Sequence, residues 1–211
     1  GTMKKGSVRL DHNVRKSRQC NLYPPPPNTA GSVQTRLALI EAVNGLREGL
    51  QASATLQLPE MAPFCTELNY LLYPMGGHYM RHLDVPAQDD GWDRVGRLAC
   101  DGGSFSGART RRVISFILYV NADWDTASGG ELRVYPAYER AHGKETPHVE
   151  DVTPEGGTLV LLMSSDVEHL VRETRRERQC VVGWFREQRE ERVPDRDVMS
   201  LRDWPAEAEG E

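Results

Sequence analysis

The sequence predicts a mainly β protein of the α+β class, with a jelly-roll core (a double-stranded β-helix) buttressed by N-terminal helices. Six short runs rich in β-branched and aromatic residues follow one long helical pattern, and clusters of Gly, Pro, Asp and Ser separate them. Helices and strands do not alternate along the chain. This order favours a sandwich or jelly roll over a doubly wound parallel sheet.

The helical pattern begins after Ser32, a residue type that commonly caps a helix. Apolar residues then recur at steps of three and four, which predicts one face of a helix of about five turns. These residues are Val33, Leu37, Ile40, Val43, Leu46 and Leu50. We expect this face to pack on a sheet, after a polar flank that includes the stiff segment 24–27.

The predicted strands are short runs of β-branched or aromatic residues that clusters of turn residues separate. They are Glu67–Tyr73, Tyr79–Asp84, Arg112–Val120, Glu131–Tyr135, Thr158–Met163 and Cys180–Phe185. We expect a flank at 1–31, one domain at 32–190 with its jelly-roll core at about 64–186, and a charged tail at 191–211. Long polar or Gly-rich loops are expected at 85–111 and 137–150, and a short helix at 197–204.

Composition narrows the function classes. The 211 residues carry a net charge of −5, which argues against a nucleic-acid partner. No apolar run approaches the roughly 20 residues that cross a bilayer, and the start lacks the apolar segment of a secretory signal. The four cysteines (Cys20, Cys65, Cys100 and Cys180) form no Cys-x-x-Cys pair. We therefore expect reduced thiols in an intracellular protein.

A candidate metal site combines His82 and Asp84 with the distant His169. His82 and Asp84 are two residues apart, so on a strand their side chains leave the same face. Two imidazoles and one carboxylate form the facial triad that binds ferrous iron and leaves coordination positions open. The His-x-Asp pair alone is weak evidence, because such triplets arise by chance. The alternative interpretation is an exposed strand end with a salt-bridged aspartate.

Features elsewhere in the sequence favour the metal site. His169 follows a predicted strand and a turn, so it can approach the end of the sheet that carries His82. On its strand, Arg178 shares a face with Cys180, Val182 and Trp184. A buried guanidinium needs an anionic partner, and a dicarboxylate suits its planar fork. Tyr119, which shares a face with Ser115 and Ile117, places a hydroxyl beside that carboxylate.

Three separated motifs occur in a familiar order. They are Tyr-Pro…Gly…Tyr-x-x-His-x-Asp, then Leu-Tyr-x-Asn-x-Asp-Trp-Asp…Gly-Gly-x-Leu-Arg, then a His followed nine residues later by an Arg. Over about 64–186 this order resembles the iron- and 2-oxoglutarate-dependent prolyl 4-hydroxylases. Within them the chain looks most similar to the oxygen-sensing, hypoxia-inducible-factor-type prolyl hydroxylases and their microbial and protist relatives.

The resemblance assigns roles to individual residues. It makes His82, Asp84 and His169 the iron ligands. Arg178 and Tyr119 would bind the distal carboxylate of 2-oxoglutarate, where collagen-type enzymes place a lysine instead of Arg178, and Tyr73 would lie near the iron-bound end. The substrate pocket would be formed by Ile117, Leu132, Trp184 and Arg81. His78, His142 and His148 are not expected to be ligands.

The resemblance also implies an activity. The catalytic domain at 32–190 would use Fe(II), 2-oxoglutarate and dioxygen, with ascorbate as reductant, to hydroxylate C4 of an exposed proline in a cytosolic or nuclear target protein. Succinate and carbon dioxide would be released. The alternatives are the same chemistry on another side chain or a small molecule, and a non-catalytic jelly-roll binding module. Three segments depart from the family pattern: the one after Tyr73 and the one between Asp125 and Gly129 are each a residue shorter, and loop 85–111 is longer. We expect that loop to close over the target.

Overall fold

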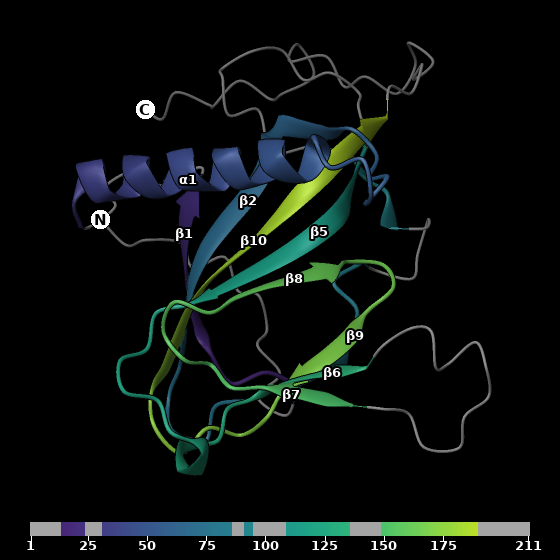
Figure 1. Cartoon of the computed structure of the whole chain (residues 1–211). Coiled ribbons are helices and arrows are strands. Elements are labelled where there is room, and N and C mark those ends of the chain that lie inside the picture. Colours follow the sequence, from purple (N-terminus) through teal and green to yellow (C-terminus); the bar gives the residue numbers. More distant parts are fainter. Residues whose placement is uncertain (1–13, 24–30, 86–90, 95–108, 136–148, 190–211) are drawn as a thin grey trace, which may run out of the picture.

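A computed structural model describes residues 14–23, 31–85, 91–94, 109–135 and 149–189, which form two antiparallel sheets and one long helix (Figure 1). The major sheet has the order β1 (Arg18–Tyr23), β2 (Met61–Tyr73), β10 (Arg178–Arg189), β5 (Arg109–Tyr119) and β4 (Asp93–Arg94), with β8 (Leu159–Met163) also paired to β5. The minor sheet has the order β3 (Tyr79–His82), β9 (Glu168–Val171), β6 (Leu132–Tyr135) and β7 (Glu150–Val152). The predicted jelly-roll class is confirmed.

The two sheets pack against each other through an apolar cluster that both supply. Leu71, Ile117 and Cys180 come from the major sheet, and Leu132 and Val171 from the minor sheet. Alternate residues of the major sheet point to its other face and form a second cluster under the helix. The predicted inward face of the last long strand is therefore confirmed.

Helix α1 (Val33–Gln51) begins where the sequence predicts. The Ser32 hydroxyl accepts a hydrogen bond from the Thr35 amide at 3.3 Å, so Ser32 is the N-cap. The helix lies on the outer face of the major sheet (Figure 1). It is the one α-helix among the described residues, where the sequence analysis expects more than one.

The apolar face of α1 is buried over only part of its length. Val43 is buried and Leu46 and Leu50 pack against the second cluster, but Val33 and Leu37 are 64% and 60% exposed. In Figure 1 the first turns of α1 extend beyond the edge strand β1, so no sheet lies beneath them. The expectation that the whole face is covered is wrong for these two turns.

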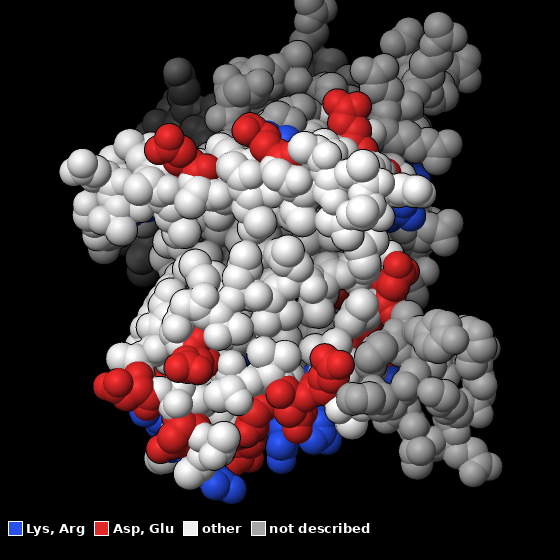
Figure 2. Space-filling model, in the orientation of Figure 1, with Lys and Arg blue, Asp and Glu red and all other residues white. Residues whose placement is uncertain are grey.

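Part of the major sheet's outer face is also left open by α1. Leu159, Leu161 and Met163 alternate along β8 and are each more than a third exposed. Figure 2 shows largely uncharged surface below α1, with Asp and Glu side chains on either side of it.

Four strands are absent from the sequence prediction. Strand β1 lies in the polar segment expected as a flank, and it pairs with β2 as the edge of the major sheet. Strands β4, β7 and β9 have two, three and four residues, which is too short for a periodic pattern to show. The expected helix at 197–204 and most of the two long loops lie outside the described residues.

The described part of the chain can be compared with the expectations about membrane spans and cysteines. None of its helices is long and apolar enough to cross a membrane. Cys20 is an exposed free thiol and Cys180 a buried one, whereas the side chains of Cys65 and Cys100 lie outside the described part.

Candidate active site

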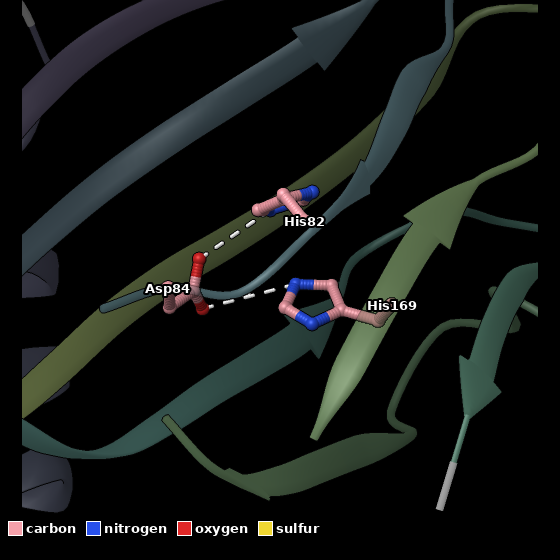
Figure 3. A group of neighbouring side chains, drawn as sticks. All are labelled: His82, Asp84 and His169. Carbon is pink, nitrogen blue, oxygen red and sulfur yellow. Dashed lines mark ion pairs between the residues drawn. The ribbon is translucent and has the colours of Figure 1, made fainter. Parts of the chain in front are cut away.

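Three side chains from two neighbouring strands converge between the sheets (Figure 3). His82 ends β3, Asp84 follows two residues later, and His169 lies on β9 directly opposite His82. Their ligand atoms all lie within 4.8 Å of one another. Asp84 Oδ1 is 3.4 Å from Nε2 of His82, and Asp84 Oδ2 is 3.8 Å from Nε2 of His169. The predicted triad is therefore assembled in space.

Backbone carbonyls fix the orientation of both imidazoles. Nδ1 of His82 donates to the carbonyl of Met80 at 2.7 Å, and Nδ1 of His169 donates to the carbonyl of Val167 at 3.2 Å. The Nε2 atoms are thus the free ligand atoms, and both face Asp84. Metal-binding histidines are commonly held by this kind of partner on the other ring nitrogen.

The electrostatics of the triad suit metal ligation. Burial raises the pKa of Asp84, but its close contacts with His82 and His169 and with the neighbouring Ser115 outweigh burial, so this pKa lies well below its usual range. Burial lowers the pKa of His169, against the opposing effect of Asp84. A carboxylate and a neutral imidazole are the forms that bind a metal ion.

The triad lines a cavity of about 510 Å³ between the sheets. The lining also contains Tyr73, Arg178, Ile117, Leu132 and Trp184, which are predicted site residues. Tyr119 is fully buried behind this wall, with its ring 4.9 Å from the Arg178 guanidinium. The structure thus brings the predicted metal, cosubstrate and wall residues together.

The guanidinium of Arg178 is almost completely buried yet incompletely paired. Its Nε donates to the carbonyl of Gly130 at 2.9 Å and its Nη1 lies 3.6 Å from the Cys180 sulfur, whereas Nη2 has no hydrogen-bond partner among the described residues. The hydroxyl of Tyr119 also lacks a partner in the described part of the chain. Leaving such groups unpaired is costly, so both atoms are donors that suit a bound carboxylate.

Burial keeps the neighbouring phenols protonated. It raises the pKa of Tyr73 to about 12 and that of Tyr119 further, although the Arg178 charge acts in the opposite direction. The centres of both rings lie 4.9 Å from the guanidinium carbon of Arg178. The two hydroxyls can therefore act as hydrogen-bond donors to an anion beside Arg178.

Comparison with known proteins identifies the family. Residues 68–186 match the 2OG-Fe(II) oxygenase superfamily. The chain belongs to this superfamily. Its Fe(II) and 2-oxoglutarate fit the residues present, because the triad offers two imidazoles and one carboxylate for iron, and Arg178 and Tyr119 offer unpaired donors for a carboxylate.

Similar solved structures within this oxygenase superfamily are prolyl hydroxylases. The prolyl-4-hydroxylase of Pseudomonas putida is 27% identical, with a TM-score of 0.57 over 84% of this chain and 75% of that one. A Trichoplax adhaerens prolyl hydroxylase, solved with a hypoxia inducible factor peptide fragment, is 19% identical, with a TM-score of 0.52 over 82% of this chain and 63% of that one. A Phytophthora capsici prolyl 4-hydroxylase is 19% identical, with a TM-score of 0.53 over 79% and 46%. The last two show the fold.

Arg81 and His78 lie apart from the residues that form the oxygenase site. Arg81 is absent from the cavity lining and points to the outer face of the minor sheet, because its strand neighbour His82 points inward. There it donates to the Glu168 carboxylate and stacks on Tyr135, 3.8 Å from the ring. His78 is not in the ligand group, and His142 and His148 lie outside the described residues.

A charged support beside the triad is not predicted by the sequence pattern. The Arg112 guanidinium stacks on Trp184 at 3.8 Å, donates to the Asp84 carbonyl at 3.1 Å and forms an ion pair with Glu67 at 3.0 Å. A β-bulge skips Val113 in the pairing of β5 with β10 and turns Arg112 onto the inner face. Simple alternation along the strand predicts the opposite face for Arg112.

Proposed function

We propose that this oxygenase is a prolyl 4-hydroxylase that acts on a proline residue of a target protein. It would consume dioxygen and 2-oxoglutarate and release succinate and carbon dioxide. The observation that carries the proposal is that the His82, Asp84 and His169 triad and Arg178 line the same cavity. The 27% identity with the Pseudomonas putida prolyl-4-hydroxylase over 84% of this chain supports the choice of proline.

The protein's own residues would hold and orient the two bound groups. Bound iron and 2-oxoglutarate would activate dioxygen, the oxidant that hydroxylates an unactivated C–H bond while 2-oxoglutarate is oxidised to succinate and carbon dioxide. His82, Asp84 and His169 would hold the metal at the wall of the cavity, and a triad of this kind leaves coordination positions open. Arg178 would anchor the far carboxylate of 2-oxoglutarate, since its Nη2 is buried without a partner.

The cavity walls would protect the reaction from water. Ile117, Leu132 and Trp184 line it with apolar surface, and Leu132 is fully buried. A dry, preorganised site strengthens the electrostatic contacts to the bound groups and limits side reactions. We further propose that the target is cytosolic or nuclear and that ascorbate serves as the reductant.

A turnover assay tests the proposal. Purified protein is incubated with Fe(II), 2-oxoglutarate, ascorbate and a panel of proline-containing peptides, and succinate and peptide masses are recorded. We expect at least one peptide to stimulate succinate formation and to gain one oxygen on proline. His169→Ala should abolish both signals, whereas His78→Ala, which removes a histidine outside the ligand group, should retain them.

Other outcomes of the assay would contradict the proposal. Succinate formation that no peptide stimulates would keep the oxygenase chemistry and reassign the substrate to another side chain or a small molecule. An absence of both turnover and metal binding would indicate a non-catalytic binding module.

A further inference from the structure

The cavity extends from the triad to the edge of the major sheet. Four polar residues line this extension, which we call the β1 wing: Arg15, Gln19, Asn21 and Asn69. In the β1–β2 ladder Gln19 lies opposite Leu71, and Asn21 lies opposite Asn69. Residues that pair directly share one face of a sheet, so Gln19, Asn21 and Asn69 lie on the inner face with Leu71. The wing is thus continuous with the space above the iron ligands.

Arg15 lies over an aromatic ring that in turn stacks on the triad. Its guanidinium carbon lies 4.9 Å from the centre of the Tyr79 ring, and the Tyr79 ring stacks on His82 with 3.7 Å between ring centres. Its Nε donates to the Ser17 hydroxyl at 2.6 Å. Among the described residues Arg15 has no acidic partner, so a cation without a counter-charge lies one aromatic ring away from an iron ligand.

The other cavity charges have partners or assigned roles. Asp84 would bind the metal, and Arg178 the cosubstrate. Arg112 is paired with Glu67, and Glu67 is also 2.8 Å from Arg186, so this carboxylate already serves two arginines. Ferrous iron and 2-oxoglutarate carry opposite double charges that cancel. Arg15 is therefore the one arginine of the described lining that neither a described carboxylate nor the cosubstrate would face.

The amides of the wing are oriented and partly free. Nε2 of Gln19 donates to Oδ1 of Asn69 at 2.9 Å, and Asn69 is only 5% exposed. This bond fixes both side chains and leaves the Asn69 Nδ2 group as a donor and Gln19 Oε1 as an acceptor. A neutral donor and acceptor side by side match the groups that a peptide bond presents.

From the leftover charge and the oriented amides we infer that the β1 wing is a substrate subsite for a carboxylate. Arg15 binds the side chain of an acidic residue close to the target proline, and Gln19 and Asn69 bind the adjoining main chain. The inference rests on the proposed prolyl hydroxylase activity and names the class of target: a polypeptide with Asp or Glu beside its proline. A guanidinium and a carboxylate form a strong charge-assisted pair.

Binding of matched peptides tests this subsite. The probes are blocked hexapeptides with one proline and a glutamate placed in turn at each other position, each with a glutamine twin. Calorimetry measures their affinity for the full chain loaded with Mn(II) and 2-oxoglutarate without oxygen. We expect at least one glutamate peptide to bind about tenfold more tightly than its twin, as befits one partly exposed ion pair.

Variants assign the preference to one side chain. Arg15→Gln should remove the difference between the twins, and Arg15→Lys should restore part of it, because lysine keeps the charge without the planar fork. Arg18→Gln is the matched control. It removes the same charge from a nearby position, the first residue of β1, but Arg18 pairs with Leu72 and lies outside the cavity lining, so the preference should persist.

Three results would overturn the inference. In the first, no glutamate peptide outbinds its twin; in the second, the preference persists in Arg15→Gln. In the third, free proline binds through Arg15 and is hydroxylated while no peptide is, so the carboxylate is that of the amino acid itself. A glutamate preference that depends on Arg15, without hydroxylation of proline in air with Fe(II), would support the subsite and refute the proposed function.

Discussion

Replacing Arg178 by methionine should remove 2-oxoglutarate binding while changing the stability of the ligand-free protein little. In the ligand-free protein the substitution loses the bond from Arg178 to the Gly130 carbonyl and two ring contacts. It also removes a buried charge that has no ionic partner among the described residues. These effects oppose each other, so we expect the free energy of unfolding to change by less than about 2 kcal/mol.

The ligand-bound protein should behave differently. Two charge-assisted hydrogen bonds from a guanidinium to a carboxylate contribute about 1.5–3 kcal/mol each, so their loss weakens 2-oxoglutarate binding by roughly 100-fold or more. At a concentration 100 times the wild-type Kd, 2-oxoglutarate stabilises the wild type by about 2.7 kcal/mol but Arg178→Met by about 0.4 kcal/mol. For a chain of this size the rise in Tm is then roughly 5–10 °C against about 1 °C.

Thermal unfolding with Mn(II), with and without 2-oxoglutarate, measures both effects. The matched control is Arg186→Met, which removes another buried arginine from the same strand. Arg186 is 2.8 Å from Glu67 and donates to the Thr110 hydroxyl at 2.6 Å, so its loss should destabilise the ligand-free protein by about 3 kcal/mol. The rise in Tm caused by 2-oxoglutarate should persist in this control.

Two results would refute the reasoning about Arg178. If Arg178→Met keeps the wild-type rise in Tm with 2-oxoglutarate, the unpaired Nη2 atom is not the carboxylate anchor. If the variant loses as much ligand-free stability as Arg186→Met, the guanidinium is a structural element whose burial is already compensated.

Further substitutions test the triad and its supports. His169→Ala should abolish tight Mn(II) binding in a chelator competition, and wild-type affinity in the variant would remove this residue from the ligand set. Arg81→Ala should weaken Mn(II) binding about tenfold, because the Arg81–Glu168 pair joins β3 to β9 where the pairing of these strands is irregular. Glu168→Ala should weaken Mn(II) binding to the same extent. Unchanged affinity in both variants would exclude a positioning role for this pair. Gly183→Ala should lower the free energy of unfolding in urea by about 2–4 kcal/mol, since a Cβ there would clash with the Phe116 ring; an unchanged urea midpoint would contradict this packing.

Most of the fold and the metal site could be predicted because they follow regular periods. The spacing of His82 and Asp84 places both on one side of a strand end, and the period of three to four residues predicts α1. The same regularity predicts that Arg178 and Trp184 share the cavity face, as their positions in the lining confirm. Such periods report which way a side chain points, and they are reliable wherever the ladder is unbroken.

Arg112 and the β1 wing could not be predicted because they lie where these periods break. The bulge at Val113 reverses the alternation that otherwise sends Arg112 away from the cavity. Strand β1 is an edge strand whose cavity-facing side is polar, and its place in the sheet is decided by pairing with β2, which sequence periodicity does not encode. Arg178 and Trp184 lie where β10 pairs with β2 without a register shift, so their shared face follows from alternation. Arg112 and the β1 wing reach the same cavity from a bulge and from the edge of the sheet, where the sequence pattern gives no direction.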